Sequence, residues 1–145
     1  MFEQQDYILR IIGLWGQALR RALESLRLGH GGDALEYSEQ AIGLALDTDP
    51  SLVLRLTPEG LVAYLGIGGA IDVRRVKMLA DALDARADAL DALSREEEAD
   101  LDRRRAGAIR DAAGLDGTEV LVGMSEADAM FAERAGEAGE ASDDA

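Results

Sequence analysis

The sequence lacks cysteine altogether, and histidine and lysine each occur once, as His30 and Lys77. Without cysteine the chain can form neither a disulfide framework nor a thiolate metal site. A lone imidazole would need carboxylates to complete a zinc site, which is an uncommon ligand set, so we expect no bound metal. A histidine acting as a general base also needs an oriented nucleophile, and the sequence indicates none. We therefore interpret His30 as a solvated turn residue.

Long hydrophobic runs are missing as well. The most apolar stretch, residues 7–19, is interrupted by Arg10 and Gln17, and it is shorter than the roughly 20 residues that cross a bilayer. The N-terminus has no basic region ahead of an apolar stretch, so we expect no signal peptide. These absences predict a cytoplasmic protein without a membrane partner.

Positive charge is scarce, because 15 basic residues face 29 acidic ones and the net charge is −14. Such a chain repels phosphate backbones, so we expect no nucleic-acid partner. The acid is unevenly spread: residues 119–145 hold eight acidic residues and one basic one, whereas residues 1–30 hold four arginines and three acidic residues. We predict a helical domain over residues 1–113 and an acidic C-terminal segment over residues 114–145, with a short helix and a disordered end.

Apolar residues recur at steps of three and four along residues 4–28, which is the spacing of one helix face. This face comprises Ile8, Ile11, Ile12, Trp15, Leu19, Leu23 and Leu26. Gly13 and Gly16 each lower helix propensity by about 1 kcal/mol relative to alanine, and we explain them by the close approach of another helix. The glycines between Gly29 and Gly32 then end the helix.

Residues that favour helix starts mark the next elements. Asp33 with Glu36 predicts a capping box for a helix over about residues 34–47. Asp49-Pro50 predicts a short helical turn, and Thr57-Pro58 and Asp72 predict two further starts.

The region from residue 72 to residue 113 allows two interpretations. Ser94 with Glu97 has the spacing of a capping box, so we predict two helices with a turn near Ser94. A single helix of about 40 residues is the alternative, since no glycine or proline lies between Gly69 and Gly107.

Two helix pairs share a pattern. In the first, Trp15-Gly16 lies in the leading helix, and the trailing helix runs from Gly32 to Asp49-Pro50. In the second, residues 80–93 lead and residues 96–113 trail, with small residues at Ala99 and Ala106. With the opening Met1-Phe2 and residues 6–10, the pattern resembles an uncharacterised bacterial family of short tetratricopeptide-like proteins over residues 1–113. The resemblance implies an all-α fold of antiparallel helical hairpins, packed as a small bundle or short solenoid, with no known activity.

Two glycine-rich stretches could suggest phosphate binding. Gly66-Ile67-Gly68 would need a third glycine where Ile71 stands, and it follows a helix start rather than a strand. The stretch from Gly29 to Gly32 lacks the Lys-Ser/Thr ending of a P-loop. We interpret both as helix ends and expect no cofactor, no catalytic residue and no enzymatic activity.

Four aspartates form a possible acidic face at helical spacing, Asp81, Asp84, Asp88 and Asp91. Such carboxylates could bind cations, but di-metal sites in bundles add a Glu-x-x-His motif that this chain lacks. We therefore predict a solvated face. Arginines 103–105 and Arg110 follow several acidic residues, so local pairs such as Asp100 with Arg104 explain them.

The sequence favours a non-catalytic protein interaction or adaptor module. Two split repeats leave helix faces uncovered, so we predict a homodimer that forms through the N-terminal helix. The candidate interaction surface comprises Tyr7, Arg10, Gly13, Trp15, Gly16, Met130 and Phe131. Trp15 and Tyr7 are also core candidates, because an aromatic residue at helical spacing is usually buried. Met130 and Phe131 would lie on a helix that docks on this domain or on a partner.

The alternatives belong to other classes. One is an acidic decoy or regulator that binds a basic partner site through the aspartate face and the C-terminal segment. The other is a metal-dependent enzyme that uses the carboxylates.

Overall fold

The computed structural model describes residues 2–66 and 72–115, and every regular element within these ranges is a helix. The helices are α1 (Phe2–Arg27), α2 (Gly31–Leu46), α3 (Pro50–Val53), α4 (Pro58–Leu65), α5 (Val73–Ala92) and α6 (Glu96–Ala113). The predicted all-α class is confirmed for this part of the chain. The predicted C-terminal helix with Met130 and Phe131, and the predicted disordered end, lie outside the described residues.

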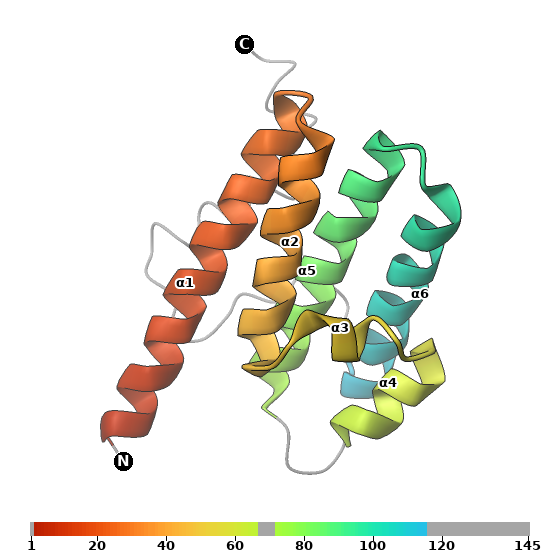
Figure 1. The fold of residues 1–145 in the computed structure, drawn as a ribbon. Coiled ribbons are helices and arrows are strands. Elements are labelled where there is room, and N and C mark those ends of the chain that lie inside the picture. The colour runs from red at the N-terminus through yellow and green to blue at the C-terminus, as the bar shows by residue number, and fades with distance from the viewer. Residues whose placement is uncertain (1, 67–71, 116–145) are drawn as a thin grey trace.

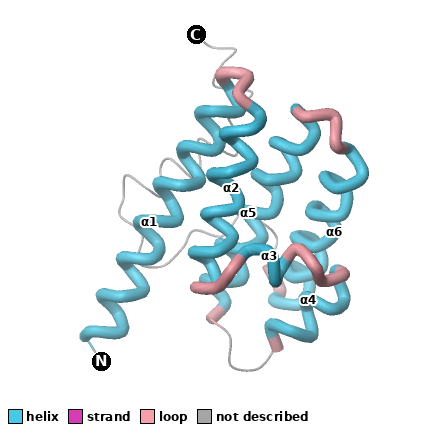
Figure 2. Tube along the Cα trace, in the orientation of Figure 1, coloured by secondary structure: helices cyan, strands magenta, loops and turns pink. Residues whose placement is uncertain are grey.

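Four long helices stand in a row, in the order α1, α2, α5, α6 (Figure 1). Consecutive members run in opposite directions, and each packs against the next. The short helices α3 and α4 lead the chain from the end of α2 across the face of the row to α6 (Figure 2). The row therefore contains two antiparallel hairpins, α1–α2 and α5–α6, joined through the contact between α2 and α5.

The starts of α3, α4 and α5 follow the predicted capping chemistry. The Thr57 hydroxyl accepts a 2.9 Å hydrogen bond from the Gly60 amide at the start of α4. Asp49 and Asp72 accept bonds from the amides of Ser51 and Arg74 in the same way, at 2.9 and 2.8 Å. These side chains satisfy amides that have no partner within the helix.

Residues 72–113 form two helices, as predicted, but the turn is built differently from the predicted capping box. Ser94 adopts a left-handed φ of 61°, and Arg95 occupies the N-cap position without a side-chain hydrogen bond. The Ser94–Glu97 box is therefore wrong. The turn is instead closed by a backbone hydrogen bond that the Arg95 amide donates to the Leu90 carbonyl, at 2.8 Å.

The start of α2 also departs from prediction. Asp33 lies within the first turn, and the N-cap residue is His30, which is exposed and makes no side-chain cap bond. A Cβ atom at Gly31 would stand only 3.0 Å from the Leu93 side chain. The helix begins three residues earlier than predicted, and this glycine lets the α1–α2 turn pack against the end of α5.

The core lies between the row and the α3–α4 connection. Its largest buried side chains include Trp15, Ile12, Ile42, Leu61, Leu79, Leu83 and Ile109, which come from α1, α2, α4, α5 and α6. Trp15 is 2% exposed, and its Nε1 donates a 3.2 Å hydrogen bond to the Met78 carbonyl of α5. No helix within residues 2–66 and 72–115 combines the length and apolarity needed to cross a bilayer.

Replacing Asp72 tests the cap of α5. Its pKa lies below the ordinary 3.8, chiefly because the Arg74 side chain donates to the carboxylate and the Arg74 amide adds a further bond. A carboxyl with a lowered folded-state pKa stabilises the fold above its unfolded pKa, and this contribution is lost as pH falls through the folded value. We expect Asp72→Ala to lower the free energy of unfolding by about 0.5–2 kcal/mol at neutral pH.

The deficit of Asp72→Ala should shrink at about pH 3, measured by urea denaturation followed by circular dichroism. Asp72→Asn keeps a capping oxygen but cannot titrate, so it should cost less at neutral pH and leave a flatter acid response. An Asp72→Ala deficit that stays constant with pH would contradict this account of the cap.

Candidate functional site

Three charged side chains lie inside the α5–α6 hairpin, and we name them the charged core: Arg86, Asp102 and Arg105. They are 8%, 0% and 4% exposed. Asp102 Oδ2 accepts from Arg86 Nη1 and its Oδ1 accepts from Arg105 Nη1, both at 2.7 Å. One buried carboxylate is thus held between two guanidinium groups.

The charged core extends to two further parts of the protein. Arg86 Nε donates to Glu39 of α2 at 3.0 Å. Arg105 donates from Nη2 to the Leu54 carbonyl at 2.9 Å and from Nε to the Leu56 carbonyl at 2.8 Å. These carbonyls follow α3, where the helix leaves them without backbone partners. The network therefore ties together α2, both helices of the hairpin and the α3–α4 connection.

Burial and the neighbouring charges act in opposite directions on the pKa values of this network. Burial raises the pKa of Asp102, and the two arginines oppose that effect. Burial also disfavours the charged form of Arg86, but Asp102 and Glu39 outweigh it and raise the pKa of Arg86. Perturbed groups of this kind mark functional sites or structural ion networks. Because Asp102 is fully enclosed and both of its oxygens are occupied, it serves as a structural anchor.

The sequence interpretation missed the charged core, although a signal was present. In α5 the buried residues Val76, Leu79, Leu83, Arg86 and Leu90 follow steps of three and four. In α6 the buried residues Ala99, Asp102, Ala106 and Ile109 do the same. Each core-facing line thus contains one charge, and the two charges have opposite signs. Buried charges are almost always paired, so this coincidence could have predicted the contact.

The four aspartates of the predicted acidic face lie on α5 and pair with arginines of α6. Arg103 Nη2 lies 2.9 Å from Asp88 and 2.6 Å from Asp91, on the partly exposed edge of the hairpin. Arg110 reaches Asp81 at 2.8 Å and Asp84 at 2.6 Å. All four aspartates form ion pairs between the two helices. Asp84, Asp88 and Asp91 nevertheless stay 40%, 50% and 42% exposed, so the acidic face is partly solvated and paired with arginines.

The predicted local pairing explains only part of the arginine cluster. Asp100 and Arg104 do pair within α6, at 3.0 Å. Arg103 and Arg110 instead pair with α5, and Lys77 joins Asp81 from within α5 at 2.9 Å. Among residues 2–66 and 72–115 no three His, Cys, Asp or Glu side chains are grouped so as to hold a metal ion.

The predicted interaction surface divides into buried and exposed members. Trp15 and Gly16 are buried, so Trp15 belongs to the core and not to the surface. A Cβ at Gly13 would meet no described atom within 4 Å, and one at Gly16 would meet only Arg20 of the same helix, at 3.7 Å. The predicted close approach of another helix at these glycines is not found among the described helices.

Tyr7 and Arg10 are exposed, as an interaction surface requires, and they belong to a longer line that we name the α1 stripe. The stripe comprises Tyr7, Arg10, Leu14, Gln17, Arg21, Glu24 and Leu28, all of them exposed. Their spacing of three and four residues places them on one side of the helix. Its apolar members Tyr7, Leu14 and Leu28 are 40%, 44% and 58% exposed.

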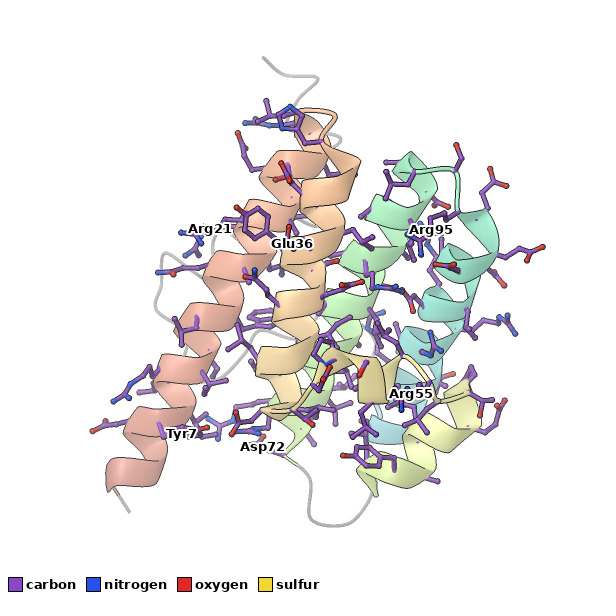
Figure 3. The ribbon with its side chains drawn as sticks, in the orientation of Figure 1. Tyr7, Arg21, Glu36, Arg55, Asp72 and Arg95 are labelled. Carbon is purple, nitrogen blue, oxygen red and sulfur yellow. The ribbon has the colours of Figure 1, made fainter. Side chains whose placement is uncertain are left out.

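The α1 stripe borders α2. The Tyr7 hydroxyl donates to Asp47 just beyond α2, at 2.8 Å, and this bond raises the pKa of Tyr7. Arg21 lies over the Tyr37 ring of α2, 5.9 Å from its centre. Tyr7 and Arg21 mark the two ends of this border (Figure 3). The contacts hold both side chains in place while leaving them accessible.

Comparisons of the chain with protein-family models, curated proteins and solved structures find no match. A functional proposal therefore has to rest on the charged core, the ion pairs and the α1 stripe themselves.

Asp102→Asn tests the charged core. The substitution keeps the shape but removes the charge that two buried arginines share, so we expect the free energy of unfolding to fall by about 3–5 kcal/mol. Asp100→Asn, at the exposed pair on the same helix, is the matched control and should change it by no more than about 0.5 kcal/mol. Equal effects in urea denaturation would show that burial gives Asp102 no special weight.

Trp15 and Leu14 are neighbours with opposite environments, which gives a second test. Trp15→Ala removes a buried ring and should cost about 3–5 kcal/mol of unfolding free energy. Leu14→Ala changes a residue of the stripe and should stay within about 0.5 kcal/mol. Thermal and urea unfolding followed by circular dichroism measure both. A large loss in Leu14→Ala would mean that the stripe is part of the core.

Proposed function

We propose that this protein is a non-catalytic interaction module that binds through the α1 stripe and self-associates there as a homodimer. The observation that carries the proposal is the exposure of Tyr7, Leu14 and Leu28 in one line along the end helix of the row. Polar stripe residues lie between these apolar side chains, so the surface offers a partner both apolar contact and charge along one side of a helix. The helix presents them on a rigid support.

The distribution of charge supports α1 as the contact between copies. Within α1 four arginines face three acidic residues, whereas α6 at the other end of the row holds six acidic residues and four arginines. Two copies that meet through α1 therefore keep their acidic ends apart. Charges further apart than the Debye length, about 8–10 Å in physiological salt, repel little.

We also propose that the row is a short tetratricopeptide-like solenoid, with α1–α2 and α5–α6 as two repeats and residues 50–66 as an insertion. Support comes from the two consecutive antiparallel hairpins and from small buried residues at the packing points, such as Ala41, Ala45, Ala99 and Ala106. Each unit of a solenoid contacts only its neighbours, so the end helix keeps one uncovered side. The α1 stripe lies on such an end helix.

The ion pairs favour the interaction module over the two alternatives. An acidic decoy would have to release Asp88 and Asp91 from Arg103 before offering them to a partner. A carboxylate metal site would likewise compete with Arg110 for Asp81 and Asp84. Both alternatives lose the contacts that join α5 to α6.

Light scattering and sedimentation velocity test the proposed dimer. We expect a dimer mass for the native chain and a monomer mass for Leu14→Glu, because a carboxylate on the stripe would be buried without a partner in the contact. Leu52→Glu is the matched control, since Leu52 is 38% exposed on α3 and lies outside the stripe. It should leave the dimer intact.

Two outcomes would change the proposal. A native chain that stays monomeric at high concentration overturns self-association. A dimer that survives Leu14→Glu but is lost in Gly13→Leu places the contact on the neighbouring glycine side of α1.

A further inference from the structure

The α1 stripe has a second candidate occupant within the same chain. Among the described helices α1 packs chiefly against α2 and α5, and the stripe stays exposed beside α2. We propose that residues 126–135 of the acidic C-terminal segment dock on the α1 stripe of their own chain and compete there with a second copy. This inference rests on the proposed function of the stripe as a binding surface.

The chain is long enough for this contact. The described part of the C-terminal side ends at Leu115, beyond α6, at the same end of the row as the start of α1 (Figure 1). From α6 to α1 there are three helix spacings of about 9 Å, or about 27 Å in all. Roughly eight or nine extended residues span that distance. Residues 116–125 therefore provide the link, and residues 126–135 arrive at α1.

The order of chemistry along the two surfaces matches. On the stripe, Leu14 and Gln17 lie between Arg10 and Arg21. In the C-terminal segment the apolar pair Met130-Phe131 lies between Asp128 and Glu133.

The match is a basic, apolar, basic surface facing an acidic, apolar, acidic peptide. Burial of the apolar pair on Leu14 supplies the affinity, at about 25 cal/mol per Å² of apolar surface. The flanking charges orient the segment. Residues 126–135 bring three acidic residues and one arginine, Arg134, to this surface.

Docking within the chain would regulate self-association. A segment that covers the stripe most of the time lowers the fraction of chains able to dimerise, and the apparent affinity falls by that fraction. Removing the apolar contact of the segment should raise the apparent affinity of dimerisation. We expect Met130→Ser combined with Phe131→Ser, which removes the apolar contact without adding charge, to tighten dimerisation by about tenfold, measured by sedimentation over a dilution series.

The absence of cysteine allows a direct test by site-specific spin labelling. Ala132→Cys in the full chain carries a nitroxide, and nuclear magnetic resonance records which amides it broadens at a concentration where light scattering shows monomer. Broadening centred on α1 around Leu14, with the outer side of α6 unaffected, supports the proposal. A nitroxide at Ala112→Cys, which is exposed on α6, is the control and should leave the α1 stripe sharp.

Charge variants add a readout of the docking chemistry. Arg10→Glu combined with Arg21→Glu should abolish the broadening of α1, and raising the salt concentration should weaken it. Arg55→Glu, an exposed arginine outside the stripe, is the control and should leave it unchanged. Circular dichroism checks that each variant keeps its helices.

Two results would overturn the inference. One is an α1 that the Ala132 label leaves sharp. The other is broadening that occurs only between chains, when spin-labelled chains are mixed with isotope-labelled chains that carry no spin label. If residues 126–135 do not dock on the stripe but the chain still dimerises, this inference is wrong and the proposed function stands. If the segment docks but the chain never dimerises, the inference stands and the proposed self-association is wrong.

Discussion

The ion pairs that Asp102 makes with Arg86 and Arg105 are the interaction on which the rest of this structure depends. A buried carboxylate loses its hydration, and only nearby positive charge and hydrogen bonds offset that loss. Both Asp102 oxygens are bonded at 2.7 Å, so the partners must arrive together and in one register. An apolar pair at the same level would allow α5 and α6 to slide. Opposite charges on the two core-facing lines specify a single alignment of the hairpin.

The same network explains why the α3–α4 connection can lie across the row. The carbonyls of Leu54 and Leu56 are partly buried, and Arg105 supplies two donors to them in the fixed geometry of its guanidinium group. Val53 and Leu61 on either side of these carbonyls are fully buried. One arginine thus joins the stretch between α3 and α4 to the buried side of α6.

The sequence predicted what depends on neighbours in the chain. Apolar periodicity located the long helices, and the caps at Thr57 and Asp72 were correct because such caps form between residues two or three apart. The predictions failed where a distant residue decides. Gly31 starts α2 early because Leu93 packs against it. The aspartates of α5 are paired as well as partly exposed, because Arg103 and Arg110 reach them from another helix. Trp15 is buried and donates to the carbonyl of Met78, 63 residues away, so it does not belong to the predicted surface.

The bond from Trp15 to Met78 has a consequence for how the chain is made. α1 is synthesised first, yet part of its apolar side has no partner until α5 has followed, because the contact spans 63 residues. Contacts this distant in sequence delay folding. During translation the indole ring and its apolar neighbours on α1 therefore remain available to other proteins after α2 has emerged from the ribosome. Apolar surface that stays exposed in this way during synthesis is prone to aggregation.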